Sequence, residues 1–399
     1  MNGEALFSAS SNYRWVMLTL IWLVYFAGFM IVSAVPPLVT PIAQDLNLTY
    51  SQTGFILGNV LLAYIPLAVP VGLIIDRIGT KRSLGIGITL ASMSGILGSF
   101  ASNFETMFLS IFTFSIGGPF ISVGSPKIVA SWFSGRDRGL ASGIYVTGAF
   151  IGGSTALAIT NTLIMPLVGT WRNTLRLYGL FGLLITFICL LLAREATHTK
   201  TMKTKTVPLR EALAKMLKEK HVWIIAIMSL SLSISGYGLG RWLPKLLELK
   251  GMSSAEAGLL ASVPGWCSVI GSIVIPSLGK TGTRKPLVFI ILLVQGICIF
   301  TTGITIGWPL ITSLIFYGIS SAANFPLLIV ILMDLPHVGA EYIGVAGGIV
   351  FSIIGLGSFI GPSMVGFLAD LTGSILPGVI ALTMVVEVML IFTLLMKET

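Results

Sequence analysis

Arg241 is the residue whose chemistry is most specific in this sequence. It follows Ser229, Ser233 and Tyr237 at steps of four residues, inside an apolar stretch that spans 222–247. Residues four apart lie near one face of an α-helix, so these side chains form a slowly turning polar stripe. A guanidinium group matches carboxylates and similar oxyanions through paired hydrogen bonds. The stripe therefore favours a binding site for an anion.

Two other roles for Arg241 stay open on the sequence alone. The residue lies close to the end of its apolar stretch, from which a long side chain can reach the lipid headgroups. It could also close an extracellular gate with an acidic residue such as Asp45. Lys127, which lies inside another apolar stretch, is expected to extend to the cytoplasmic surface by the same route.

Polar residues also gather in two other apolar stretches. Polar side chains that face lipid are costly, so such residues normally face protein or water. Hydrogen bonding between helices is the alternative explanation, above all for single serines. The predicted substrate-binding residues are Arg241, Tyr237 and Ser233 from the first stretch, Asn324, Tyr317 and Ser321 from 307–333, and Tyr25 from 14–40.

The stretches that carry these residues are predicted to be membrane helices. Of 399 residues, 55% are hydrophobic and 10% are charged, whereas a soluble domain carries roughly 25% charged residues. Apolar runs of about 20 residues can cross a hydrocarbon core about 30 Å thick. We therefore predict an all-α integral membrane protein with twelve transmembrane helices, at about 14–40, 51–75, 83–102, 105–133, 138–166, 173–193, 222–247, 255–278, 286–303, 307–333, 341–369 and 375–396.

The net charge of +9 is explained by topology. If both termini are placed in the cytoplasm, eighteen of the 24 Lys and Arg residues fall on the cytoplasmic side and four lie at or near outer loops. This distribution follows the positive-inside rule. We expect a multi-pass protein of the plasma membrane with both termini cytoplasmic. Its expected partners are the lipid bilayer and a small-molecule substrate, with no nucleic acid, and the protein is expected to be a monomer.

The sequence shows no arrangement of residues typical of an enzyme. The three histidines are dispersed, the three cysteines lie in apolar runs without metal-ligand spacing, and no phosphate-binding loop is present. We expect no enzymatic activity, no metal and no cofactor. Asp and Glu are also missing from the middle of the stretches that carry the predicted site, and Glu387 lies in the last apolar run. Exchange, uniport or protonation of the substrate is therefore favoured over a dedicated proton relay.

The two halves of the chain repeat one another. The matched segments are LTYSQTGFIL at 48–57 with MSSAEAGLLA at 252–261, GTKR at 79–82 with GTRK at 282–285, and RDRGLASGI at 136–144 with EYIGVAGGI at 341–349. The offsets are 204, 203 and 205 residues, which makes chance a poor explanation. We predict an N-terminal six-helix bundle at 1–194, a basic cytoplasmic linker at 195–220 and a C-terminal six-helix bundle at 221–399.

The stretch GLIIDRIGTKR at 72–82 resembles the Gly-x-Leu-x-Asp-Arg-x-Gly-Arg-Lys/Arg signature of the major facilitator superfamily, with Thr80 in place of the commoner Arg. WFSGRDRGLASG, WRNTLRLYGLFGLL and GPSMVGFLADLTGS also resemble segments of that superfamily, and the resemblance covers the whole chain. It implies two pseudo-symmetric six-helix bundles, a central cavity lined by helices 1, 4, 7 and 10, and transport by alternating access.

Two looser resemblances point to different substrates. RWLPKLLELKGMS resembles the cyanate and nitroimidazole branch, and LAYIPLAVP resembles the feline leukaemia virus receptor-related carriers, which are linked to choline and haem. Arg241 favours a small organic or inorganic anion. A carrier of an organic cation or a hydrophobic drug is the alternative, followed by a gated channel or a non-transporting receptor.

The signature also predicts a conformational latch made of Gly72, Asp76, Arg77 and Gly79. Gly79 permits a tight turn, and Arg77 anchors it in the cytoplasm. The resemblance places Asp76 beside the N-terminus of helix 11, near residues 339–343, where the helix dipole would stabilise a carboxylate by roughly 0.3–1 kcal/mol. The alternative is a well-anchored loop.

Two pairs of glycines are predicted to let helices pack closely. Gly148 and Gly152 in helix 5, and Gly357 and Gly361 in helix 11, are each four residues apart and lie on one helix face. The resemblance implies that helices 2, 5, 8 and 11 meet across the seam between the halves.

Overall fold

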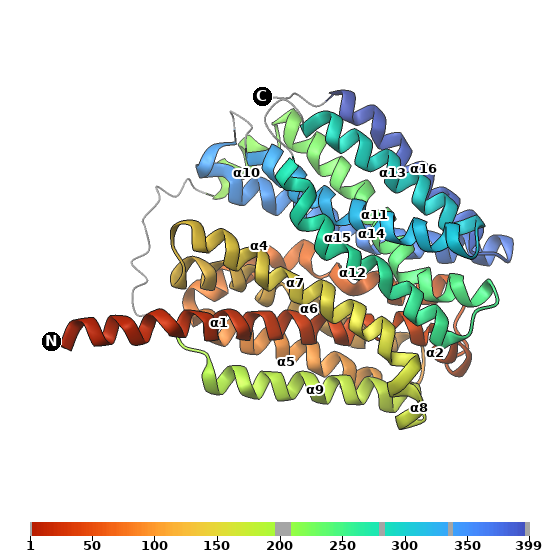
Figure 1. Ribbon diagram of the computed structural model, residues 1–399, viewed down its shortest axis with the longest axis horizontal. Helices are drawn as coiled ribbons and strands as arrows, with labels where there is room; N and C mark the ends of the chain where they lie inside the picture. The colour runs from red at the N-terminus through yellow and green to blue at the C-terminus, as the bar shows by residue number, and fades with distance from the viewer. Residues whose placement is uncertain (1, 196–208, 279–283, 334–337, 396–399) are drawn as a thin grey trace.

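The computed structural model describes residues 2–195, 209–278, 284–333 and 338–395, and within them it contains helices and no strand (Figure 1). The elements in chain order are α1 (Asn2–Ser33), η1 (Pro36–Leu38), α2 (Val39–Asp45), α3 (Tyr50–Gly58), η2 (Asn59–Leu61), α4 (Tyr64–Ile78), α5 (Thr80–Gly98), α6 (Phe104–Trp132), α7 (Gly135–Ile159), η3 (Thr160–Ile164), α8 (Met165–Val168), α9 (Trp171–Leu192), α10 (Leu209–Met216), α11 (Lys220–Leu249), α12 (Ser254–Leu278), α13 (Arg284–Ile304), α14 (Trp308–Met333), α15 (Gly339–Thr372) and α16 (Leu376–Leu395).

Twelve membrane spans follow from this order, as predicted. Ten segments are long and apolar enough to cross a membrane. The other two spans are α14, with 26 residues, and α5, whose 19 residues begin with polar Thr80, Lys81 and Arg82 and are rich in glycine and serine. Three spans are interrupted, because η1 separates α1 from α2, η2 separates α3 from α4, and one π-helical turn, η3, separates α7 from α8.

The spans connect two ends of the molecule. We call one the Gly79 end, which holds α10 and the turns at Gly79 and Gly135, and the other the Asp45 end, which holds α2 and the turns at Gly169, Gly251, Gly307 and Gly373. In Figure 1 the Asp45 end, with α2, lies to the right and α10 lies to the left. An even number of spans returns the chain to the Gly79 end.

Each half is held together by the glycines that the sequence singled out. Gly148 and Gly152 of α7 lie against the carbonyls of Trp22 and Phe26 of α1. Gly357 and Gly361 of α15 lie in the same way against Leu230 and Ile234 of α11, and each position follows its counterpart by 208 or 209 residues. The sequence repeat is thus a repeat of packing. The expected place of these glycines at the seam between the halves is wrong, because they lie inside each half.

Another set of glycines forms the seam. A Cβ at Gly54 or Gly58 of α3 would lie 2.5 or 2.7 Å from a backbone carbonyl of α15, and one at Gly258 of α12 would lie 2.6 Å from the Leu157 carbonyl of α7. Gly54 and Gly258 are matched positions of the sequence repeat. The helices 2, 5, 8 and 11 of the prediction therefore do meet across the seam, as α3, α7, α12 and α15.

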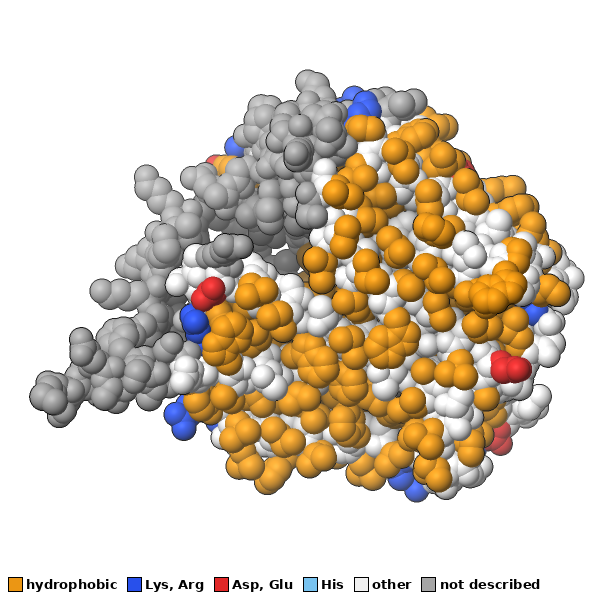
Figure 2. All heavy atoms as spheres, in the orientation of Figure 1, with side chains coloured by type: hydrophobic (Ala, Val, Ile, Leu, Met, Phe, Trp, Pro, Cys, Tyr) orange, Lys and Arg blue, Asp and Glu red, His pale blue; other side chains and the backbone are white. Residues whose placement is uncertain are grey.

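The surface is that of a membrane protein. Figure 2 shows one face covered largely by hydrophobic side chains, with few charged ones. Large apolar side chains such as Leu167, Trp308 and Leu371 are 72%, 81% and 66% exposed. Exposed apolar side chains over helices that satisfy their own backbone hydrogen bonds suit contact with lipid.

Candidate functional site

Arg241 is buried inside the helix bundle. Its side chain is 8% exposed, and one guanidinium nitrogen, Nη1, donates a 3.1 Å hydrogen bond to the carbonyl of Val32 on α1. The guanidinium carbon lies 5.9 Å from the ring centre of Tyr237. Among the described residues no carboxylate forms an ion pair with Arg241. Extension to the lipid headgroups is therefore ruled out for this conformation.

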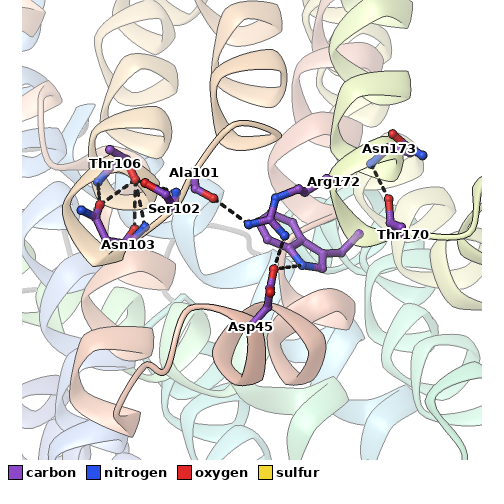
Figure 3. A network of polar contacts seen from close by, with 9 residues as sticks. Asp45, Ala101, Ser102, Asn103, Thr106, Thr170, Arg172 and Asn173 are labelled. Atoms are coloured by element: carbon purple, nitrogen blue, oxygen red, sulfur yellow. Dashed lines mark hydrogen bonds and ion pairs between the residues drawn. The ribbon is translucent and has the colours of Figure 1, made fainter.

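Asp45, the expected gate partner of Arg241, is engaged elsewhere. Its carboxylate accepts a 3.0 Å hydrogen bond from the Trp171 indole and pairs with Arg172 (Figure 3). Arg172 also donates to the carbonyl of Ala101 at 2.9 Å, so the group ties α2 to α9 and to the end of α5. The alternative of an Arg241–Asp45 gate is wrong, because the end of α2 brings Asp45 to Arg172, a cation from its own half.

An open space lies beside the helix faces that carry Arg241. A Cβ built at Gly28 of α1, or at Gly236 or Gly240 of α11, would have no described heavy atom within 4 Å. Gly28 is nevertheless buried. A guanidinium group has five N–H donors, and the contact with Val32 uses one of them. Arg241 is therefore a buried cation whose other donors have no partner among the described residues, next to a space that small residues keep open.

Tyrosines from four helices surround this region. The Tyr25 and Tyr145 ring centres are 5.0 Å apart, and Tyr25 also lies beside Ser125 of α6. Tyr64 packs over α6 and neighbours Tyr237. Two of the predicted residues, Tyr25 and Tyr237, thus join Arg241, whereas Tyr64 and Tyr145 were missed. Tyr64 stands alone in an apolar run, without a polar neighbour one turn away that would mark its face. Tyr145 has Ser142 one turn before it, a signal that could have marked its face.

Three of the four remaining predicted residues lie in contacts between helices of the second half. Asn324 donates a 2.5 Å hydrogen bond to Gln295 of α13, and Tyr317 donates to the Gly236 carbonyl at 3.3 Å. Ser233 packs against α15 at Gly357, and Ser321 bonds to a carbonyl of its own helix. These contacts favour helix packing, the alternative explanation, for Asn324, Tyr317 and Ser233, whereas the bond of Ser321 stays within α14.

The two halves are joined by polar contacts at the Asp45 end. Both carboxylate oxygens of Asp370, near the end of α15, accept hydrogen bonds from the backbone N–H groups of Tyr50 and Ser51, at 2.9 and 2.8 Å. These are the first N–H groups of α3, which have no partner inside their helix. Lys245 donates to Thr40 at 2.9 Å, adding a second contact between the halves. The Asp45 end is thus closed above Arg241.

Among the described residues, the seam is open at the Gly79 end. Gly139 and Gly143 lie on the face of α7 that packs against α12 nearer the Asp45 end, and Gly348 lies on the face of α15 that packs against α3. A Cβ at any of these three glycines would meet no described atom within 4 Å. The same helix faces therefore touch at one end of the molecule and separate at the other.

A comparison with protein families matches the model of the Major Facilitator Superfamily over residues 21–362 and 246–399. The chain belongs to this superfamily. The family predicted from the signature stretch is thereby confirmed, and so is the expectation of a multi-pass membrane transporter that is not an enzyme and acts on a small molecule.

Relatives within the superfamily share most of the chain. The "Probable nitrate transporter NarT" of Staphylococcus carnosus (strain TM300) is 26% identical over 358 residues, which cover 87% of each chain. The "Probable galactarate/D-glucarate transporter GudP" of Bacillus subtilis (strain 168) is 23% identical over 411 residues, covering 91% of this chain and 87% of the relative. A bacterial homologue of the human lysosomal transporter Spinster, solved in an inward-facing and occupied conformation, has the same fold, with a TM-score of 0.76, 19% identity and 96% of each chain covered.

The superfamily signature forms the predicted turn. Gly79 has φ +87° and links α4 directly to α5, which confirms the reason for a glycine there. Asp76 accepts a 2.5 Å hydrogen bond from Lys127 of α6, and Lys127 also donates to the Gly72 carbonyl at 3.1 Å. In this conformation the Asp76 carboxylate therefore pairs inside its own half, with the cation that was expected to extend to the surface. Its contact with the start of α15, and the role of Arg77, stay predictions.

Proposed function

We propose that this protein carries a small anion across the plasma membrane by alternating access, with Arg241 as the residue that binds the anion. The burial of Arg241 without an acidic partner in the described part of the chain carries this proposal. Taking a charge out of water costs several kcal/mol unless a partner compensates for it. An anion in the space beside Gly28 and Gly240 would be that partner.

The names of the relatives support the choice of an anion. Nitrate and galactarate or D-glucarate, the solutes in the names of two relatives, are all anions. The tyrosine cluster could instead hold an organic cation against aromatic rings. That alternative places a second positive charge beside Arg241, which would repel it.

The contacts between the halves support alternating access. Closure at the Asp45 end and separation at the Gly79 end describe one of the two states that such a cycle requires. The excess of Lys and Arg assigns the Gly79 end and both termini to the cytoplasm, so this state faces inward. We propose that residues 1–194 and 221–399 are the two moving units and that 195–220 joins them; 196–208 lie outside the described residues.

Cysteine labelling tests the orientation. A cysteine at Ser102, at the Asp45 end, should react with an impermeant reagent added to intact cells. A cysteine at Lys218, at the Gly79 end, should react only after the membrane is made permeable. The reverse pattern would overturn the assignment of the two ends.

Substitution of Arg241 tests the anion site. Removing one partner of a buried charged contact costs about 2–5 kcal/mol, or roughly 30-fold to several thousand-fold in affinity. Arg241→Gln should weaken the binding of nitrate or D-galactonate to the purified protein by this amount. Arg241→Lys, which keeps the charge and loses the planar fork, should weaken it less.

Calorimetry and melting temperatures should be measured together, so that lost binding is separated from lost folding. Arg176→Gln, at an exposed arginine of α9, is the matched control and should leave affinity unchanged. Full affinity in Arg241→Gln would refute the anion site. A gain of choline binding in that variant would favour the organic-cation carrier.

A further inference from the structure

We infer that the site accepts anions with a single negative charge and discriminates against dianions. This inference rests on the proposed function, because it describes the ligand of the same site. It separates the two kinds of solute named for the relatives, since nitrate carries one negative charge and galactarate carries two.

The number of positive charges at the site is the first reason. Arg241 is the one buried charged side chain among the residues whose burial the structure describes. The cavity offers no second buried cation in that part of the chain to pair with another carboxylate. A dianion that filled the space beside Arg241 would therefore keep one negative charge without a partner.

Two other cations on membrane helices, one on α6 and one on α11, already have acidic partners. Lys127 of α6 is neutralised by Asp76 at 2.5 Å. At the Asp45 end, Lys245 of α11 lies 3.8 Å from Glu248. Both are bound to protein oxygens, so neither is free to compensate a second substrate charge.

Lys250 lies just beyond α11 and is likewise engaged. Its Nζ donates to the carbonyls of Thr302 and Thr305 at 2.6 Å each. Burial lowers the pKa of this ammonium group. It serves to join α11 to the end of α13, away from the space beside Gly28.

The remaining polar groups suit an uncharged, hydroxylated part of a ligand. The phenols of Tyr25, Tyr64 and Tyr145 come from α1, α4 and α7 and approach the same region. A phenol can donate or accept one hydrogen bond but carries no charge at neutral pH. These side chains can therefore bind hydroxyl groups, and they compensate a second carboxylate poorly.

Matched pairs of ligands test the inference on the wild-type protein. D-Galactonate and galactarate have the same carbon chain and differ by one carboxylate, and nitrate and sulfate are small oxyanions of one and two charges. A buried charge without a partner costs more than the 1–3 kcal/mol of a neutral group. In the pair that the protein binds, we expect the affinity for the monoanion to exceed that for the dianion at least about tenfold.

Calorimetry on the purified protein at pH 7.5, with one detergent for all four anions, separates failure of this inference from failure of the proposed function. Equal or tighter binding of the dianion would overturn the inference and leave an anion carrier. Binding of none of the four anions would refute the proposed function itself, and with it this inference.

A second cation should change the preference. Gly28→Lys places an ammonium group in the open space one helical turn from Val32, whose carbonyl holds Arg241. Gly28→Met, of similar length and without charge, is the matched control. The ratio of galactarate to D-galactonate affinity should rise several-fold in Gly28→Lys and stay low in Gly28→Met. Equal ratios in the two variants would show that charge number does not set the selectivity.

Discussion

The two ends of the seam use the same helix faces in opposite ways. Near the Asp45 end, Gly54 of α3 and Gly258 of α12 each meet a backbone carbonyl of the other half. Near the Gly79 end, Gly143 of α7 and Gly348 of α15 meet no described atom. Closure at one end comes from backbone approach that only glycine permits, and separation at the other leaves glycines that could permit the same approach. The seam can thus close at either end without changing the packing inside a half.

Valine substitutions at two seam glycines should change the equilibrium between the two states of the seam most strongly. Gly54→Val should force the Asp45 end apart, because its Cβ would lie 2.5 Å from the Pro362 carbonyl. A Cβ at Gly143 meets no described atom in the present state, so Gly143→Val should instead block closure of the Gly79 end. An overpacked contact costs about 1–3 kcal/mol, which shifts a two-state equilibrium by roughly five- to 150-fold.

Both valine substitutions should abolish counterflow in proteoliposomes, each by blocking closure of a different end. Electron-spin distance measurements at the two ends should show Gly54→Val open at the Asp45 end and Gly143→Val unchanged from the present state. Identical distance changes in the two variants would contradict the idea that one seam serves both ends.

Asp370→Asn should weaken closure of the Asp45 end by a smaller amount. The amide keeps the shape of the side chain and loses the charge that faces the first N–H groups of α3. Charge at a helix N-terminus is worth roughly 0.3–2 kcal/mol, so the population open at this end should rise by up to about 30-fold. Accessibility of a cysteine at Val32 to an impermeant reagent would report it. Unchanged accessibility would leave Asp370 as a cap without a role in closure.

Asp76→Asn should have the smallest effect on the stability of the present state. It should shift the equilibrium between the two states in the direction opposite to that of Asp370→Asn. Asp76 is exposed and pairs with Lys127 inside its own half, and such surface pairs contribute about 0–1 kcal/mol. The melting temperature should therefore change little. If Asp76 latches the Gly79 end when that end closes, the variant should favour the state described here. Equal transport rates in Asp76→Asn and the wild type would remove the latch.

The features that could be predicted from the sequence are those set by long apolar stretches, by repeated motifs or by rare residues. Apolar length located the spans, and repeated motifs revealed the two halves. Arg241 stood out because a cation inside an apolar helix needs a specific reason. The turn at Gly79 followed from the signature around it.

The orientation of single side chains could not be predicted, because it depends on how each helix is rotated against its neighbours. Tyr317 and Asn324 lie on a polar face, yet that face meets Gln295 and a carbonyl of α11 instead of the cavity. Asp45 was assigned the wrong cation for the same reason, since the end of α2 that carries it lies against α9. The sequence does not distinguish Asp370 from other acidic residues near helix ends. Its place at the seam follows only from its contact with α3.

The single unpaired charge of Arg241 has an electrical consequence. In the proposed cycle an empty site carries one positive charge, and a site occupied by a monoanion is neutral. A full elementary charge that crosses the membrane field exchanges about 2.3 kcal/mol per 100 mV with it. The field therefore acts on the return of the empty carrier and leaves the loaded carrier unaffected. With the cytoplasm negative, it draws the empty site inward and drives net efflux of the anion.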